Sequence, residues 1–121
     1  MGLIAKELGR ATIAATAVGS ATTIYANAAS SDSIVTQVYL YNQNTSTTVK
    51  CWVLYTPDST GSVGTPAAAD VLFTVSIPPA EAVAVPVNIA MTDTNDTIKA
   101  YADSASQILA HAHGVAYPDL S

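Results

Sequence analysis

Apolar and polar residues alternate along most of this chain, with the period of two that half-buried β-strands show. The clearest stretch runs from residue 34 to residue 42, where alternate side chains are expected to share a face. One face would hold Ile34, Thr36, Val38 and Leu40, and the other Val35, Gln37, Tyr39 and Tyr41. Tyr39 and Tyr41 lie opposite Val38 and Leu40, so they are the best candidates for an exposed aromatic contact with a partner.

Turn-forming residues divide the rest of the chain into further short strands. We predict strands over residues 11–17, 22–26, 47–56, 70–77, 81–87, 97–102 and 106–117. The turn at residues 42–46 would join its two flanking strands as a hairpin, and the last two strands would form another. Pro86 restricts its strand to a sheet edge or to the vicinity of a bulge, because proline cannot donate to the ladder.

Seven or eight short strands with regular turns are typical of an all-β domain. The predicted fold class is a seven- to eight-stranded antiparallel β-sandwich or jelly-roll-like barrel, preceded by an N-terminal arm. Residues 57–69 form one long loop, and loops of that length are usually functional or mobile. The core is expected to include Val38, Leu40, Val53, Phe73, Val75, Val85, Ile98 and Ile108.

The first ten residues do not show the alternating pattern of the rest of the chain. We assign residues 1–10 to the arm and residues 11–121 to a single β-sandwich domain. A segment this short cannot bury its own apolar side chains, so it would need a partner surface. We predict that it anchors the protein to a neighbouring subunit through Leu3, Ile4, Lys6, Leu8 and Arg10.

Charged residues are scarce, at 11% of the chain, where about a quarter is usual. A surface so poor in charge suits one that neighbouring subunits cover, so a homo-oligomer or a larger assembly is expected. The net charge of −5 argues against a nucleic-acid partner, because phosphate binding needs a basic stripe. The apolar runs are too short to span a membrane, so no membrane partner is expected.

The candidates for chemistry are few. Cys51 lies in an apolar run and is interpreted as a small buried residue. His111 and His113 project from the same face of a strand and are weak candidates for a metal site, which would need further ligands. The acidic run at residues 93–96 lacks the spacing of a calcium loop and is interpreted as a turn. We therefore expect no catalytic residues, no cofactor and no enzymatic activity.

The aromatic residues leave a second class of function open. Eight Tyr, Trp and Phe residues could serve a secreted adhesin or a carbohydrate-binding module. Since most of them lie within alternating strands, packing in the core or at an interface is the favoured interpretation.

The order of residues resembles that of small virion proteins of tailed bacteriophages. The likeness runs over about residues 10–117 and rests on strand and turn order, with no catalytic signature. It is carried by residues 21–29 (ATTIYANAA), 35–42, 48–55, 70–73 (DVLF), 77–81 (IPPAE), 95–102 (NDTIKAYA) and 108–115. The sequence departs from the pattern at Asn95, where glycine is frequent, and in its long 57–69 loop. The resemblance implies a structural role in the virion: capsid decoration (a cement protein) bound to the major capsid protein, or a tail or baseplate accessory protein.

Overall fold

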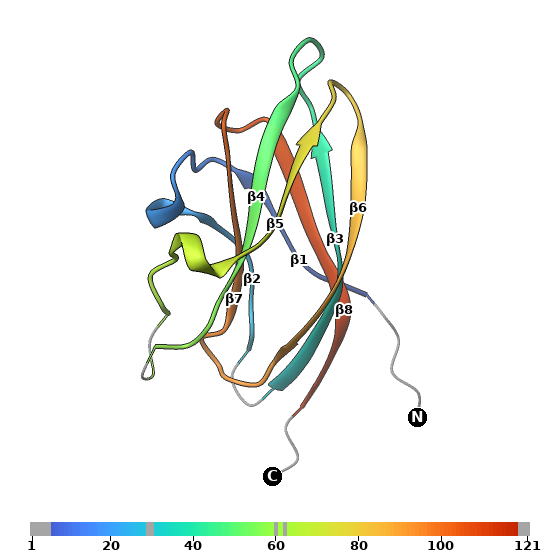
Figure 1. The fold of residues 1–121 in the computed structure, drawn as a ribbon. Coiled ribbons are helices and arrows are strands. Elements are labelled where there is room, and N and C mark those ends of the chain that lie inside the picture. The colour runs from blue at the N-terminus through green and yellow to red at the C-terminus, as the bar shows by residue number, and fades with distance from the viewer. Residues whose placement is uncertain (1–5, 29–30, 60, 62, 119–121) are drawn as a thin grey trace.

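Eight β-strands and two short 3-10 turns make up the computed structural model, which describes residues 6–28, 31–59, 61 and 63–118 (Figure 1). The strands are Lys6–Ile13 (β1), Thr22–Ala26 (β2), Ser31–Asn42 (β3), Val49–Thr56 (β4), Val71–Ile77 (β5), Ala82–Met91 (β6), Thr97–Ala102 (β7) and Ile108–Pro118 (β8). The 3-10 turns are Val18–Ser20 (η1) and Ala68–Asp70 (η2). Neither described helical turn is long enough to cross a membrane.

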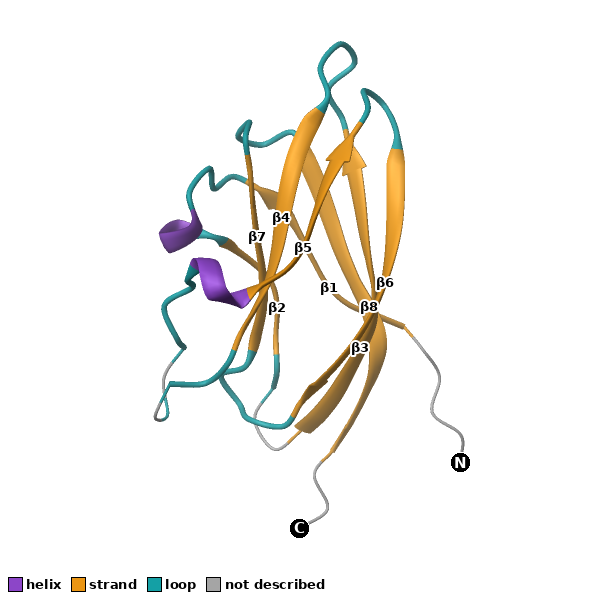
Figure 2. Ribbon diagram, viewed as in Figure 1, coloured by secondary structure: helices purple, strands orange, loops and turns teal. Residues whose placement is uncertain are grey.

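The strands form two four-stranded sheets that pack face to face (Figure 2). Sheet A has the order β1-β8-β3-β6, and sheet B has the order β2-β7-β4-β5. The chain crosses from one sheet to the other at nearly every connection, and all pairings are antiparallel. Two such interleaved sheets make an eight-stranded jelly roll, which confirms the predicted all-β sandwich class.

Both predicted hairpins are wrong. β3 lies in sheet A and β4 in sheet B, and β7 and β8 are divided in the same way. Within the described residues, β4 and β5 are the one pair of consecutive strands that bond to each other, and the long 57–69 loop joins them. A turn signal marks where a strand ends, but it does not decide whether the next strand lies beside the first or across the core from it.

The core lies between the two sheets and is made of small and β-branched side chains. Five of the eight predicted core residues are fully buried, whereas Phe73, Val75 and Val85 are partly buried. The fully buried residues among the eight are Val38, Leu40, Val53, Ile98 and Ile108. β5 and β6 are edge strands, which is why their residues keep some exposure.

A β-bulge in β3 corrects the predicted faces of that strand. The register of β3 against both β6 and β8 shifts between Val35 and Gln37. Val35 is therefore buried on the core side, and Ile34 and Thr36 turn outward, whereas Val38 and Leu40 point inward as predicted. A bulge adds one residue to one strand and reverses the alternation beyond it.

The β3 bulge and the sheet edge account for the glycine at position 114 and the proline at position 86. Gly114 pairs with Val35, and a Cβ at that position would clash with the backbone carbonyl of Ile34. Pro86 lies in β6, the edge strand of sheet A, and pairs with Gln37 next to the bulge. Both alternatives predicted for Pro86, an edge or a bulge, are confirmed.

The domain begins earlier than predicted. Residues 6–10 are part of β1 and pair with β8 in the domain's own sheet, so they do not form a separate arm. β8 is long and apolar on its inner face, and β1 satisfies the backbone groups along its open side. Leu3 and Ile4 lie outside the described residues, so the anchoring role predicted for them stays a prediction.

Candidate functional site

The outer face of sheet A brings together most of the described residues that the sequence singled out. Antiparallel pairing aligns Arg10 of β1, His111 of β8 and Tyr39 of β3 in one row across the sheet. The next row toward the β3–β4 end holds Leu109 and Tyr41. These residues alternate with buried ones, so the pleat projects them all away from the core.

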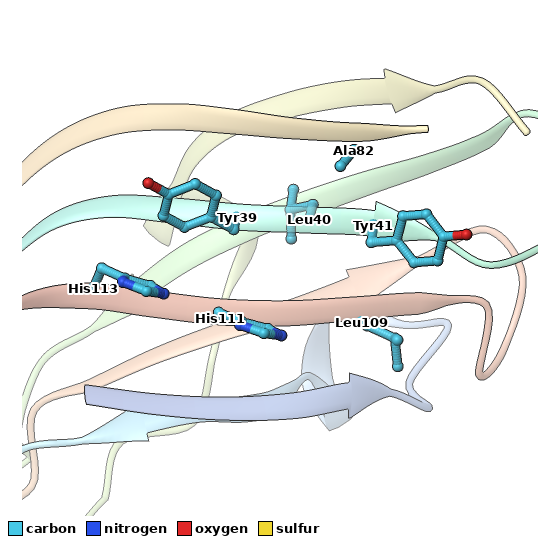
Figure 3. A pocket seen from close by; sticks show the side chains of 7 residues that line it. All are labelled: Tyr39, Leu40, Tyr41, Ala82, Leu109, His111 and His113. Atoms are coloured by element: carbon cyan, nitrogen blue, oxygen red, sulfur yellow. The ribbon is translucent and has the colours of Figure 1, made fainter. Parts of the chain in front are cut away.

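Two shallow hollows lie side by side on this face. The first, of about 240 Å³, is lined mainly by Tyr39, Tyr41, Leu109, His111 and His113, and its rim is largely apolar (Figure 3). The second, of about 330 Å³, is lined on the β1 side by residues 10–12 and shares Leu109 and His111 with the first. Together they form a groove across the four strands β1, β8, β3 and β6. We call this surface the sheet A groove.

The two tyrosines are the exposed large hydrophobic side chains of this face, at 37% for Tyr39 and 39% for Tyr41. Tyr39 is held in place: its hydroxyl donates to Oε1 of Gln37 at 2.5 Å, and its ring meets the ring of His113 edge-on at 4.6 Å. Their exposure agrees with the sequence analysis, which selected both as candidate contact residues. No bound partner is described here, so the contact itself stays a prediction.

A charged cluster borders the groove on the β1 side. Arg10 donates two hydrogen bonds of 3.0 Å to the carboxylate of Glu7, and Nδ1 of His111 lies 3.0 Å from Oε1 of the same carboxylate. The hydrogen bond from Arg10 holds the pKa of Glu7 below its usual range, and the charges of Arg10, His111 and His113 act in the same direction. Glu7 is therefore a carboxylate at neutral pH.

The predicted partner residues of the N-terminal segment divide between core and surface. Leu8 packs against the core of its own domain, so in this structure it does not project toward a neighbour. Lys6 and Arg10 are exposed on the edge strand β1. The register of β1 against β8 shifts between Glu7 and Gly9, next to Leu8.

The outer face of sheet B is built differently. Leu54 and Lys99 pair across β4 and β7 on that face, and both are buried, Leu54 completely. Nζ of Lys99 donates to Oγ1 of Thr23 at 2.9 Å, and burial lowers the pKa of this ammonium group. The turns η1 and η2 lie against this face (Figure 1) and contact β7 and β4.

An aromatic pair also lies on sheet B. Trp52 and Tyr101 stack with their ring centroids 4.7 Å apart and an angle of 4° between the planes. Nζ of Lys50 lies 5.1 Å from the centroid of the Trp52 ring. The two aromatic faces that meet in this stack are closed to a sugar ring.

The other candidates for chemistry have structural roles. Cys51 is fully buried, and desolvation, followed by the charge of Asp103, raises the pKa of its thiol to about 12, so it is not a nucleophile at neutral pH. The carboxylate of Asp96 accepts hydrogen bonds from the backbone N–H groups of Asp58, Thr92 and Asp93. It therefore closes a turn, as the sequence analysis predicted for this acidic run.

Glu7 is the functional candidate that the sequence analysis missed. It is far from the histidines in the sequence and joins them only because β1 pairs with β8, with Glu7 opposite His113. The sequence contains no signal for this pairing, since β1 and β8 are far apart in the chain and have no turn between them that fixes their register.

No protein-family model matches the sequence, and no curated protein matches it. Several solved structures align with most of the chain. A Bacillus endospore appendage, from a family of disulfide-linked pili, is 17% identical with a TM-score of 0.44, covering 98% of this chain and 91% of that chain. The cyanophage Pam1 capsid is 14% identical with a TM-score of 0.43, covering 94% and 86%. A chain of the infectious bursal disease virus particle is 11% identical with a TM-score of 0.46, and this chain spans 32% of its length. These values are too low to bear on function, and the jelly-roll assignment rests on the strand order described above.

Proposed function

We propose that this chain is a non-enzymatic structural subunit of a tailed-phage virion that packs against neighbouring virion proteins through the sheet A groove. The observation that supports this best is the pair of exposed tyrosines beside an apolar hollow on the outer face of sheet A. Tyrosine is enriched at protein interfaces because it combines a large apolar ring with a polar end. A face of this composition suits a protein partner.

The restrained position of the Tyr39 side chain also supports the proposal. The contacts of Tyr39 with Gln37 and His113 restrain its ring before any partner binds. A side chain that is already restrained loses less conformational entropy on binding, so more of the contact energy contributes to affinity. The partner would be a second copy of the chain or a coat protein of the same particle.

Within a virion we propose capsid decoration as the role, with binding to the major capsid protein. The scarcity of charged residues and the resemblance of the sequence to small phage virion proteins support this assignment. A tail or baseplate position is the alternative. Counting this chain in intact particles by quantitative mass spectrometry separates them: a decoration protein approaches the number of coat subunits, whereas a tail component is present in a few to dozens of copies.

The groove is tested by replacing Tyr39 and Tyr41 together with serine. The double variant is expected to fold as the wild type does, by circular dichroism, but to lose self-association in light scattering or binding to the particle. Leu72→Ser is the matched control, because Leu72 is equally exposed, at 37%, but lies on β5 of sheet B. If the double variant associates as well as the wild type, or if the control loses association equally, the groove is not the interface.

A further inference from the structure

We infer that Glu7, His111 and His113 form a binding site for a first-row transition metal ion such as Zn²⁺ on the outer face of sheet A. One ligand atom from each of the three residues lies within 4.8 Å of the others. Imidazole nitrogen with a single carboxylate is a donor set that suits Zn²⁺, Ni²⁺ and Cu²⁺, whereas Mg²⁺ and Ca²⁺ prefer oxygen alone.

The positions of the two histidines suit a shared ion. His111 and His113 project side by side from β8 with their rings nearly parallel, at an angle of 2° and a centroid distance of 6.2 Å (Figure 3). Ligand atoms around a tetrahedral zinc ion lie about 3.4 Å apart, because each zinc–nitrogen bond is about 2.0–2.1 Å long. Nδ1 of His111 is already 3.0 Å from Oε1 of Glu7, so small rotations of these side chains bring the set together.

The site is open on its outward side. The side chains of His111 and Glu7 are 35% and 31% exposed, so an ion held there would keep coordination positions facing away from the sheet. Three protein ligands leave the fourth position of a tetrahedral zinc ion free. Water would fill the free position in the isolated chain.

Arg10 would compete with a metal ion for the carboxylate of Glu7. It holds both oxygens of Glu7 with hydrogen bonds of 3.0 Å and places a positive charge beside the site. The side chain of Arg10 is 67% exposed, and surface ion pairs are weak, so an incoming ion can displace it. This competition gives the site an unusual signature: removing a charged neighbour should tighten metal binding.

The test is calorimetric titration of the full chain with Zn²⁺ alone at about pH 7.5, because protons compete with a metal ion for its ligand atoms at lower pH. The wild type should bind one ion per chain. His111→Ala, His113→Ala and Glu7→Gln should each weaken binding roughly tenfold or more, and Arg10→Gln should strengthen it severalfold. Thr12→Ala, next to the site on the same strand, is the control and should bind as the wild type does. Circular dichroism checks that each variant is folded.

Three outcomes would overturn the inference. The first is no stoichiometric binding by the wild type. The second is unchanged binding after loss of either histidine. The third is a loss of binding in the histidine variants while Glu7→Gln and Arg10→Gln match the wild type, which would show a two-histidine chelate in place of the three-ligand site. Because the titration contains no other virion protein, the result does not depend on whether the sheet A groove binds one.

Discussion

The strands of the two sheets share the same alternating sequence pattern, but their outward side chains differ in how far they are exposed. On sheet A, Tyr39 and Tyr41 stay exposed beside an open groove. On sheet B, Leu54 and Lys99 are buried, although both point away from the core. The difference comes from the connections, since η1 and η2 lie over sheet B. The chain covers part of the outer face of sheet B with its own turns and leaves the sheet A groove open.

The largest expected effect is that of Leu54→Ala. Leu54 is fully buried on the outer face of sheet B, so truncation should lower the free energy of unfolding by about 2–5 kcal/mol. Leu109→Ala makes the same chemical change on the outer face of sheet A, where the side chain is only partly buried, and should cost clearly less. Urea denaturation measures both, and equal losses would show that sheet B is no better covered than sheet A.

The cover of sheet B depends on the loop that carries η2, and Asp96 anchors the start of that loop. Its Oδ1 accepts the N–H of Asp58 at 2.8 Å, and the side chain is buried. Asp96→Ala leaves backbone donors without partners, so it should cost about 1–3 kcal/mol and speed amide exchange at Leu54. The neighbouring Asp93→Ala removes an exposed carboxylate and should leave both measurements close to the wild type.

A smaller effect is expected when Lys99 is replaced. Burial lowers the pKa of this ammonium group, which shows that the folded state disfavours its charge. Lys99→Met keeps the length of the side chain and removes the charge, so the melting temperature should stay the same or rise, with a change within about 1 kcal/mol. Lys50→Met, at an exposed position, serves as the control. A marked fall for Lys99→Met would mean that the hydrogen bond to Thr23 outweighs the cost of burial.

The smallest effect concerns pH and sheet A. The pKa of Glu7 is lowered from 4.5 in the folded state, so the carboxylate contributes stability above that value, and the contribution is lost as the pH falls through the lower folded pKa. Glu7→Gln should therefore flatten the acid side of the stability profile slightly. Arg10→Gln should have the same effect, because Arg10 is the main cause of the shift. Urea midpoints between about pH 7 and about pH 3 test this, and a profile that neither variant changes would contradict it.

The alternation of residues predicted most of the strands, and β2 and β7 were placed to the residue. The first strand was misplaced, because it was expected at residues 11–17 and lies at Lys6–Ile13. It could not predict which sheet each strand joins, because an inward apolar row looks the same in sequence whether the next strand lies beside it or across the core. The bulge at residues 35–37 also escaped prediction, since an added residue leaves the local composition unchanged. The exposed tyrosines were predictable from strand period alone, whereas Glu7 needed the register of β1 against β8.

That last pairing also bears on how the protein folds. A strand at residues 6–13 closes the sheet against one at residues 108–118, and nearly every other ladder joins segments well separated in the sequence. Closing such long loops lowers the chain entropy before the strand contacts that stabilise the fold have formed. The fold should therefore form slowly for its size. During that interval the free edge of β8 is exposed to other chains. We therefore expect the yield of folded protein to depend on concentration and temperature more steeply than it would for a domain built from local hairpins.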